Sequence, residues 1–131
     1  MKKALILLMV LVAVGCIRQT VHDSSTYLDA HSFDEVWDAA VKAVYDIDFT
    51  IESVDRESGF IGASSGTHIG QEVPPNISVM ISDINGRVFV ECRVLQKEQF
   101  FDLFGHGKRI SRGFMTALNV NLNHARRGPM R

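Results

Sequence analysis

The chain has 131 residues, of which 46% are hydrophobic and 22% are charged, and its formal net charge is −1. This balance is typical of a single globular domain and argues against a disordered or fibrous chain. Nucleic-acid binding, which relies on an excess of basic residues, has no support in such a composition.

The first residues differ from the rest of the chain. Two lysines precede an apolar run from Ala4 to Val14, which Gly15 and Cys16 follow. A basic start, an apolar stretch and small residues are the three parts of a secretion signal. These eleven apolar residues would span about 16 Å as a helix, whereas a bilayer core is about 30 Å thick, so a transmembrane helix is disfavoured. The run has no polar face, which also argues against a buried amphipathic helix.

The residues Ala13-Val14-Gly15-Cys16 resemble the lipobox of bacterial lipoproteins. The resemblance implies cleavage between Gly15 and Cys16, a diacylglyceryl group on the Cys16 thiol, and a fatty acid such as palmitate on the new amino terminus. Two or more acyl chains hold a protein stably on a membrane. Ile17 in place of aspartate implies, by the same resemblance, the periplasmic face of the outer membrane. Ordinary signal cleavage or an uncleaved anchor is the alternative.

Four segments follow from this interpretation: a signal peptide (1–15), a polar tether (16–30), a domain (31–124) and a basic tail (125–131). The tether segment is rich in Ser, Thr and Asp and has no sustained period. Removal of the signal leaves twelve basic against fifteen acidic residues, a net charge of −3. With Cys16 lipidated, Cys92 is the one remaining cysteine, so we expect the domain to fold without an intrachain disulfide.

The first predicted helix begins at Ser32. Ser32 and Glu35 have the spacing of a capping box, in which each side chain accepts a hydrogen bond from the backbone amide of the other. An apolar stripe at helical spacing follows, formed by Val36, Trp37, Ala40, Val41 and Val44.

Two hairpins are predicted next. Residues 49–54 and 60–64 flank a charged turn that ends at Gly59, and residues 65–75 collect Gly and Pro and read as a loop. Residues 77–81 and 88–94 alternate apolar and other side chains on either side of Asn85-Gly86, a pair typical of a type I′ turn.

A closing helix is predicted from the stripe Ile110, Phe114, Ala117, Leu118 and Leu122. The order of elements predicts an α+β, two-layer sandwich, with a four-stranded antiparallel sheet covered by an N-terminal and a C-terminal helix. Residues 23–57 hold ten acidic and two basic side chains, and residues 87–131 hold nine basic and three acidic ones. If the two helices lie side by side, we therefore expect the acidic first helix to face a basic second one, each exposed pair contributing about 0–1 kcal/mol. Charge reversal at Arg109 and Arg112 that left stability unchanged would argue against this pairing.

Residues 32–63 resemble the opening of bacterial lipoproteins related to BamC, an accessory subunit of the outer-membrane assembly machinery. The resemblance rests on the Val36-Trp37 helix and on the turn from Asp55 to Gly59. It implies a helix-grip-like domain and a role in the cell envelope, and it covers about a quarter of the chain, with the later elements agreeing in order alone.

Catalytic and metal chemistry have little support. The histidines His22, His31, His68, His106 and His124 lack the spacing that would place two of them on one ion, so we expect no metal and no cofactor. Cys92 alternates with Val90 and Val94 and should act as a small core residue. No nucleophile, base and orienting group form a recognisable set, so we expect a protein that is not an enzyme.

One aromatic patch stands out, formed by Phe100, Phe101, Leu103 and Phe104. Either this segment folds back onto the core, or it contacts a partner or the membrane surface. The leading hypothesis is a lipid-anchored module that binds or braces another envelope protein. The alternatives are a carrier of a small apolar ligand between sheet and helices, which needs a pocket of about 300 Å³ or more, and a hydrolytic enzyme.

Overall fold

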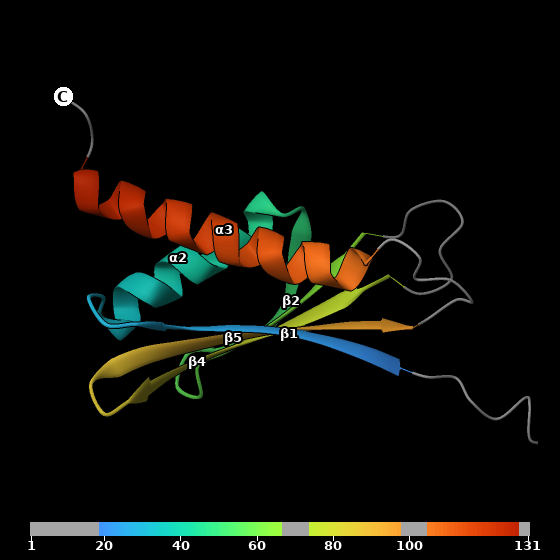
Figure 1. Ribbon diagram of the computed structural model, residues 1–131, viewed down its shortest axis with the longest axis horizontal. Coiled ribbons are helices and arrows are strands. Elements are labelled where there is room, and N and C mark those ends of the chain that lie inside the picture. Colours follow the sequence, from blue (N-terminus) through green and yellow to red (C-terminus); the bar gives the residue numbers. More distant parts are fainter. Residues whose placement is uncertain (1–18, 67–73, 98–104, 129–131) are drawn as a thin grey trace, which may run out of the picture.

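A computed structural model describes residues 19–66, 74–97 and 105–128. The elements follow in the order β1 (Gln19–Leu28), α2 (Phe33–Asp46), β2 (Phe49–Asp55), β3 (Phe60–Ser65), β4 (Asn76–Ile84), β5 (Arg87–Lys97) and α3 (His106–Arg127). All the strand pairs are antiparallel, and the sheet has the order β1-β5-β4-β3-β2. Both helices lie on one face of the sheet (Figure 1). The predicted α+β sandwich is confirmed.

The predicted number of strands is wrong by one. Residues 19–28, expected in the polar tether, form β1 and pair with β5 along their whole length. The strand escaped prediction because its alternating positions are polar on both faces: the inward side chains include Ser24 and Thr26, and the outward ones include Asp23 and Ser25. Strands are recognised in a sequence by apolar residues at alternate positions, and β1 lacks this pattern.

α2 begins as predicted. The Ser32 hydroxyl accepts a hydrogen bond from the Glu35 amide, and the Glu35 carboxylate accepts one from the Ser32 amide at 2.9 Å. The apolar stripe of α2 is buried, with Val36, Ala40 and Val44 completely inaccessible to solvent.

Both predicted hairpins form. Asn85 and Gly86 have φ angles of 56° and 79°, the positive values that a type I′ turn needs, and β4 pairs with β5 directly on either side. In the β2–β3 hairpin, Gly59 has a φ of 73° and its carbonyl accepts a hydrogen bond from the Ile81 amide of β4 at 2.8 Å. The turn is therefore tied to the third strand of the sheet.

The core lies between the sheet and the helices. Inward side chains of β3, β4 and β5 meet one stripe from each helix, and the largest completely or almost completely buried members are Phe114, Ile61, Ile77, Ile81, Leu118 and Leu122. Burial of a side chain of this size contributes about 1.5–3 kcal/mol, so this stripe supplies most of the attachment of α3.

The expected attraction between an acidic first helix and a basic second helix makes only a small contribution. The Ser32 backbone hydrogen bond is the main cause of the lowered pKa of Glu35 on α2, and the positive charge of Arg126 on α3 acts in the same direction. Among the described residues no ion pair joins α2 to α3. Instead the buried side chain of Asn121 donates a hydrogen bond to the Asp46 carboxylate at 2.8 Å. Residues 125–127, expected in the basic tail, continue α3.

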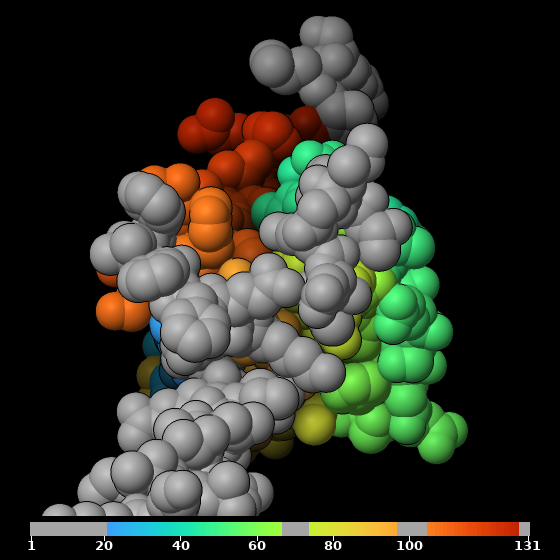
Figure 2. Space-filling view, turned by 90° about the vertical axis from the view of Figure 1, so that its right-hand side faces the viewer, coloured from blue at the N-terminus to red at the C-terminus, as the bar shows by residue number. Residues whose placement is uncertain are grey.

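Figure 2 shows the domain from the end at which α3 begins.

Gly59 should be far more sensitive to substitution than Gly86, although both have a positive φ. A Cβ at Gly59 would lie 1.9 Å from the carbonyl oxygen of Ile81, whereas a Cβ at Gly86 meets no atom within 4 Å. Gly86→Ala should cost about 1–2 kcal/mol through backbone strain, and Gly59→Ala about 1–3 kcal/mol more through overpacking. Urea unfolding measures both variants, and equal losses would contradict this placement of the turn.

Candidate functional site

The inner face of the sheet changes from apolar to polar at one end. Along β5 the inward positions Val88, Val90, Cys92 and Val94 are followed by Gln96, and along β3 the residues Ile61 and Ala63 are followed by Ser65. On β1 the inward positions at the same end are His22 and Ser24, and Ser111 covers them from α3. We call the set His22, Ser24, Ser65, Gln96 and Ser111 the inner polar end.

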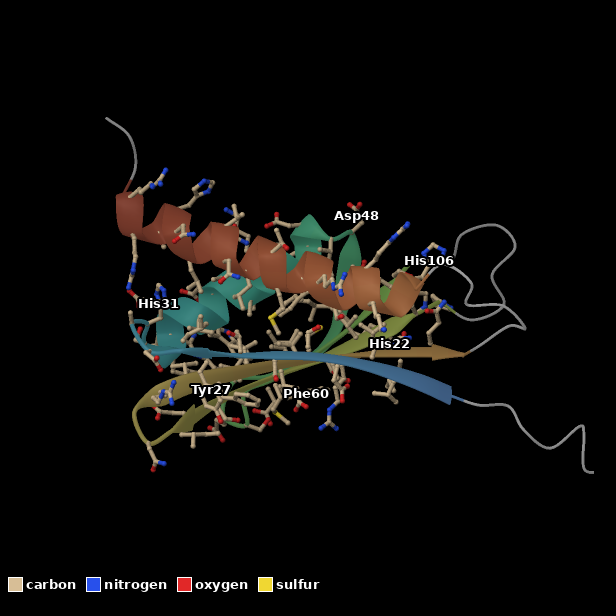
Figure 3. The ribbon with its side chains drawn as sticks, viewed as in Figure 1. His22, Tyr27, His31, Asp48, Phe60 and His106 are labelled. Carbon is tan, nitrogen blue, oxygen red and sulfur yellow. The ribbon has the colours of Figure 1, made fainter. Side chains whose placement is uncertain are left out.

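The first turns of α3 are held against β1 by small residues. The Ser24 hydroxyl lies 2.9 Å from the Ser111 hydroxyl, which also donates to the Lys108 carbonyl at 3.2 Å. Gly107 lies over His22, since a Cβ there would approach the imidazole to 2.0 Å. Figure 3 shows His22 between α3 and the sheet, with His106 on the outer side of the helix. Glycine at position 107 thus permits the closest approach of helix and strand.

Two polar atoms of the inner polar end are buried without a hydrogen-bond partner. They are the hydroxyl oxygen of Ser65, a residue 9% exposed, and the side-chain amide oxygen of Gln96. The residue pairing places β3 and β5 on either side of β4, so these side chains start about 10 Å apart, two strand spacings. Each such group costs about 1–3 kcal/mol, and a native fold that retains it usually satisfies it with a bound molecule or water.

The opposite face of the sheet carries a groove of about 380 Å³. Its walls are the apolar side chains of Val21, Phe60, Met80 and Leu95, with polar groups from Ser78, Glu91 and Arg93. Arg93 contacts the carboxylates of Glu91 at 3.1 Å and Asp23 at 3.9 Å. We call this feature the outer groove. Phe60 and Tyr27 project on this side of the sheet, away from the helices (Figure 3).

Most of the residues singled out from the sequence lie outside the described ranges. These are Gly15 and Cys16 at the expected cleavage and lipidation site, His68, and the aromatic patch Phe100, Phe101, Leu103 and Phe104. Of the other histidines, His22 lies beneath α3, and His31 contacts Glu35 at 3.7 Å. The described residues include no group of three or more His, Cys, Asp or Glu side chains that could hold a metal.

Cys92 lies in the core, as predicted, with no exposure to solvent. Burial raises the pKa of its thiol to about 12, and the negative charge of Asp23 contributes in the same direction. A nucleophilic cysteine needs a lowered pKa and access to solvent, so this thiol is not a nucleophile in the folded protein.

The inner polar end was missed from the sequence for a physical reason. Its members come from three strands and a helix, and each is a common polar residue that reads as solvated when taken alone. The one available signal was the break in alternation, where Gln96 follows four apolar or sulfur-bearing inward positions. His22 and Ser24 could be assigned to the inner polar end only after β1 had been recognised as a strand.

No family model and no curated protein matches this chain. Solved structures do resemble it. The Aha1 dimer from Colwellia psychrerythraea aligns with a TM-score of 0.57 at 11% identity, covering 79% of this chain and 96% of that one. CalU16 from Micromonospora echinospora aligns with a TM-score of 0.53 at 10% identity, covering 84% and 88%. Ara h 8.0201 aligns with a TM-score of 0.52 at 13% identity, covering 80% and 100%. These likenesses show a shared fold, a helix-grip arrangement in which the sheet packs around the C-terminal helix.

No helix within the described ranges is long and apolar enough to cross a membrane.

Cys92 should make stability fall at alkaline pH. The folded thiol keeps its proton to about pH 12 while the unfolded thiol releases it near pH 9, so the unfolded state binds fewer protons between these values. The free energy of unfolding then declines by up to about 1.4 kcal/mol per pH unit in this window. Denaturant unfolding under reducing conditions should show this component in the wild type and not in Cys92→Ala. Parallel curves for the two proteins would refute the assignment.

Proposed function

We propose that this protein is a lipid-anchored, non-enzymatic module of the bacterial cell envelope that binds a small ligand at the inner polar end. The observation that carries the proposal is the pair of buried polar atoms, Ser65 Oγ and Gln96 Oε1, that have no hydrogen-bond partner. A ligand that supplies both hydrogen bonds would remove an energetic cost that the isolated domain bears.

The neighbouring side chains limit the chemistry of the ligand. Ser65 and Gln96 are uncharged, so they suit hydroxyl or amide groups rather than an ionised group, which would need a compensating charge when buried. Beyond them the inward positions Ala63, Val94 and Ile77 are buried core residues. The rest of the interior is packed around Phe114 and Leu118, so the ligand is short, and its polar groups face Ser65 and Gln96.

The anchor part of the proposal rests on the sequence before β1. A basic start, an apolar run too short to span a bilayer and the small residues before Cys16 form the pattern of a lipoprotein signal. Lipid on Cys16 would place the domain on the membrane that carries it, and Ile17 favours the periplasmic face of the outer membrane.

Replacing the two orphaned polar groups should stabilise the empty domain while abolishing ligand retention. We expect Ser65→Ala and Gln96→Leu each to raise the free energy of unfolding of ligand-free protein by about 1 kcal/mol or more. Mass spectrometry of small molecules extracted from the full chain, purified from membranes, should show a compound with the wild type and not with either variant.

Ser64→Ala is the matched control, because Ser64 is the neighbouring serine on the outer side of β3 and donates to Glu52. It should retain the compound. If wild type and both inner variants carry the same extractable molecules, or none, the proposed ligand site is wrong.

A second candidate function, binding of another envelope protein, is favoured by the outer groove. Val21, Tyr27 and Met80 on this face are 48%, 49% and 40% exposed, and apolar side chains gathered beside a groove are typical of contact surfaces. The outer groove is large enough for one apolar side chain of a partner. Its polar residues Ser78, Glu91 and Arg93 would form part of the polar rim that surrounds the apolar centre of a protein interface.

Met80 and Ile84 provide a matched pair for testing this candidate. Both are apolar residues of β4 with similar exposure, 40% and 42%, and of the two Met80 alone lines the groove. A photoreactive side chain placed at Met80 should cross-link one protein in intact cells, and the same side chain at Ile84 should not. Equal cross-linking at both positions would indicate nonspecific contact and exclude the groove as the site.

A further inference from the structure

We infer that the end of the domain at which β1 and α3 begin docks on an anionic lipid surface. This inference rests on the membrane attachment proposed above and adds to it an orientation and a lipid chemistry. Its first support is the distance between the expected anchor and the sheet. β1 begins at Gln19, so Cys16 lies three residues, or about 10 Å of extended chain, from the first strand.

A tether running to residue 30 would have allowed the domain to turn freely, and β1 removes that freedom. His22 of β1 lies beneath Gly107 of α3, so the start of the helix is also near the anchor. Six residues separate Cys16 from His22, which sets an upper limit of about 20 Å along the chain. The first turns of α3 therefore lie at the end of the domain from which the chain leads to Cys16. Figure 2 looks onto this end, where the first turns of α3, coloured orange, reach the surface.

The second support is the charge at the start of α3. Lys108, Arg109 and Arg112 are exposed, and none of them forms an ion pair with any residue in the described ranges. The first turn contains no acidic residue, and the N-cap is Gly105, which provides no side-chain hydrogen bond. Lys108 and Arg109 thus lie in the first turn, at the positive end of the helix dipole, where cations are unfavourable, and Arg112 follows in the second turn. Lipid phosphates would offset both the side-chain charge and the dipole.

The occupant is a lipid surface rather than a soluble anion because the attachment already brings the cluster to it. Basic side chains act on anionic lipids within about one Debye length, near 8 Å at physiological salt. A chain of at most about 20 Å between Cys16 and His22 lets the start of α3 approach the lipid to this distance. The cations at the far end of α3, Arg126 and Arg127, lie seventeen and eighteen residues along the helix from Arg109, or about 26 to 27 Å away.

Energy transfer on vesicles tests the inference with the full chain. Thr116 is exposed one turn beyond Arg112, and a dye can be placed on Thr116→Cys because Cys92 is buried. The vesicles are phosphatidylcholine alone or with phosphatidylglycerol, each carrying an acceptor lipid. We expect more transfer on the phosphatidylglycerol vesicles, decreasing with salt. Lys108→Glu with Arg109→Glu should lower the docked-to-undocked ratio about tenfold or more, and acidic residues in a first helical turn are compatible with folding.

The control variant is Lys42→Glu with Arg127→Glu, two exposed cations outside this end that change the net charge by the same amount. It should retain the preference for phosphatidylglycerol. Equal losses in both double variants, or equal transfer of the wild type on both vesicles, would overturn the docking while leaving the anchor intact. Failure of the wild type to float with either vesicle would instead overturn the attachment and the docking together.

Discussion

The packing of α3 across β1 and β5 is the contact on which the rest of this structure depends. At one end Phe114, Leu118 and Leu122 are buried against the sheet and against α2. At the other end the core residues give way to Ser111 and Gly107, which lie directly on Ser24 and His22 of β1. One helix therefore closes an apolar core along part of its length and covers a polar surface along the rest. The proposed ligand site and the basic cluster both lie at the polar end of the domain.

Elements that bury an apolar face were predictable, because burial imposes a period on the sequence. The capping box at Ser32, the stripe of α2 and the Asn85-Gly86 hairpin all appear where expected. β1 was not predictable in this way, since it is an edge strand that pairs only with β5 and carries polar side chains on both faces. Its identity as a strand depends on tertiary contacts with β5 and α3, and local periodicity contains no trace of them.

The candidate site follows the same logic. Position 92 could be assigned to the core from alternation alone, because its neighbours Val90 and Val94 share its environment. Ser65 and Gln96 could not be assigned to a site, because their meaning depends on being buried without partners, and this is a property of the assembled sheet. The charge pattern indicated an acidic helix beside a basic one, but it could not specify the pairs. No ion pair joins α2 to α3 among the described residues, Asn121 donates to Asp46 across the contact, and Arg109 and Arg112 remain exposed.

The unpaired arginines at the start of α3 and the buried polar atoms of Ser65 and Gln96 share one property: both lower the stability of the isolated domain. A sequence selected for stability alone would replace Gln96 with an apolar residue and place an acidic residue near the start of α3, and each change would stabilise the isolated domain. Residues that oppose local stability are expected where a binding partner supplies the missing interaction. Gln96 pairs with the start of β1, and the basic cluster lies where α3 packs on His22 of β1. A ligand and a lipid surface at this end, as proposed, would each supply an interaction that the isolated domain lacks.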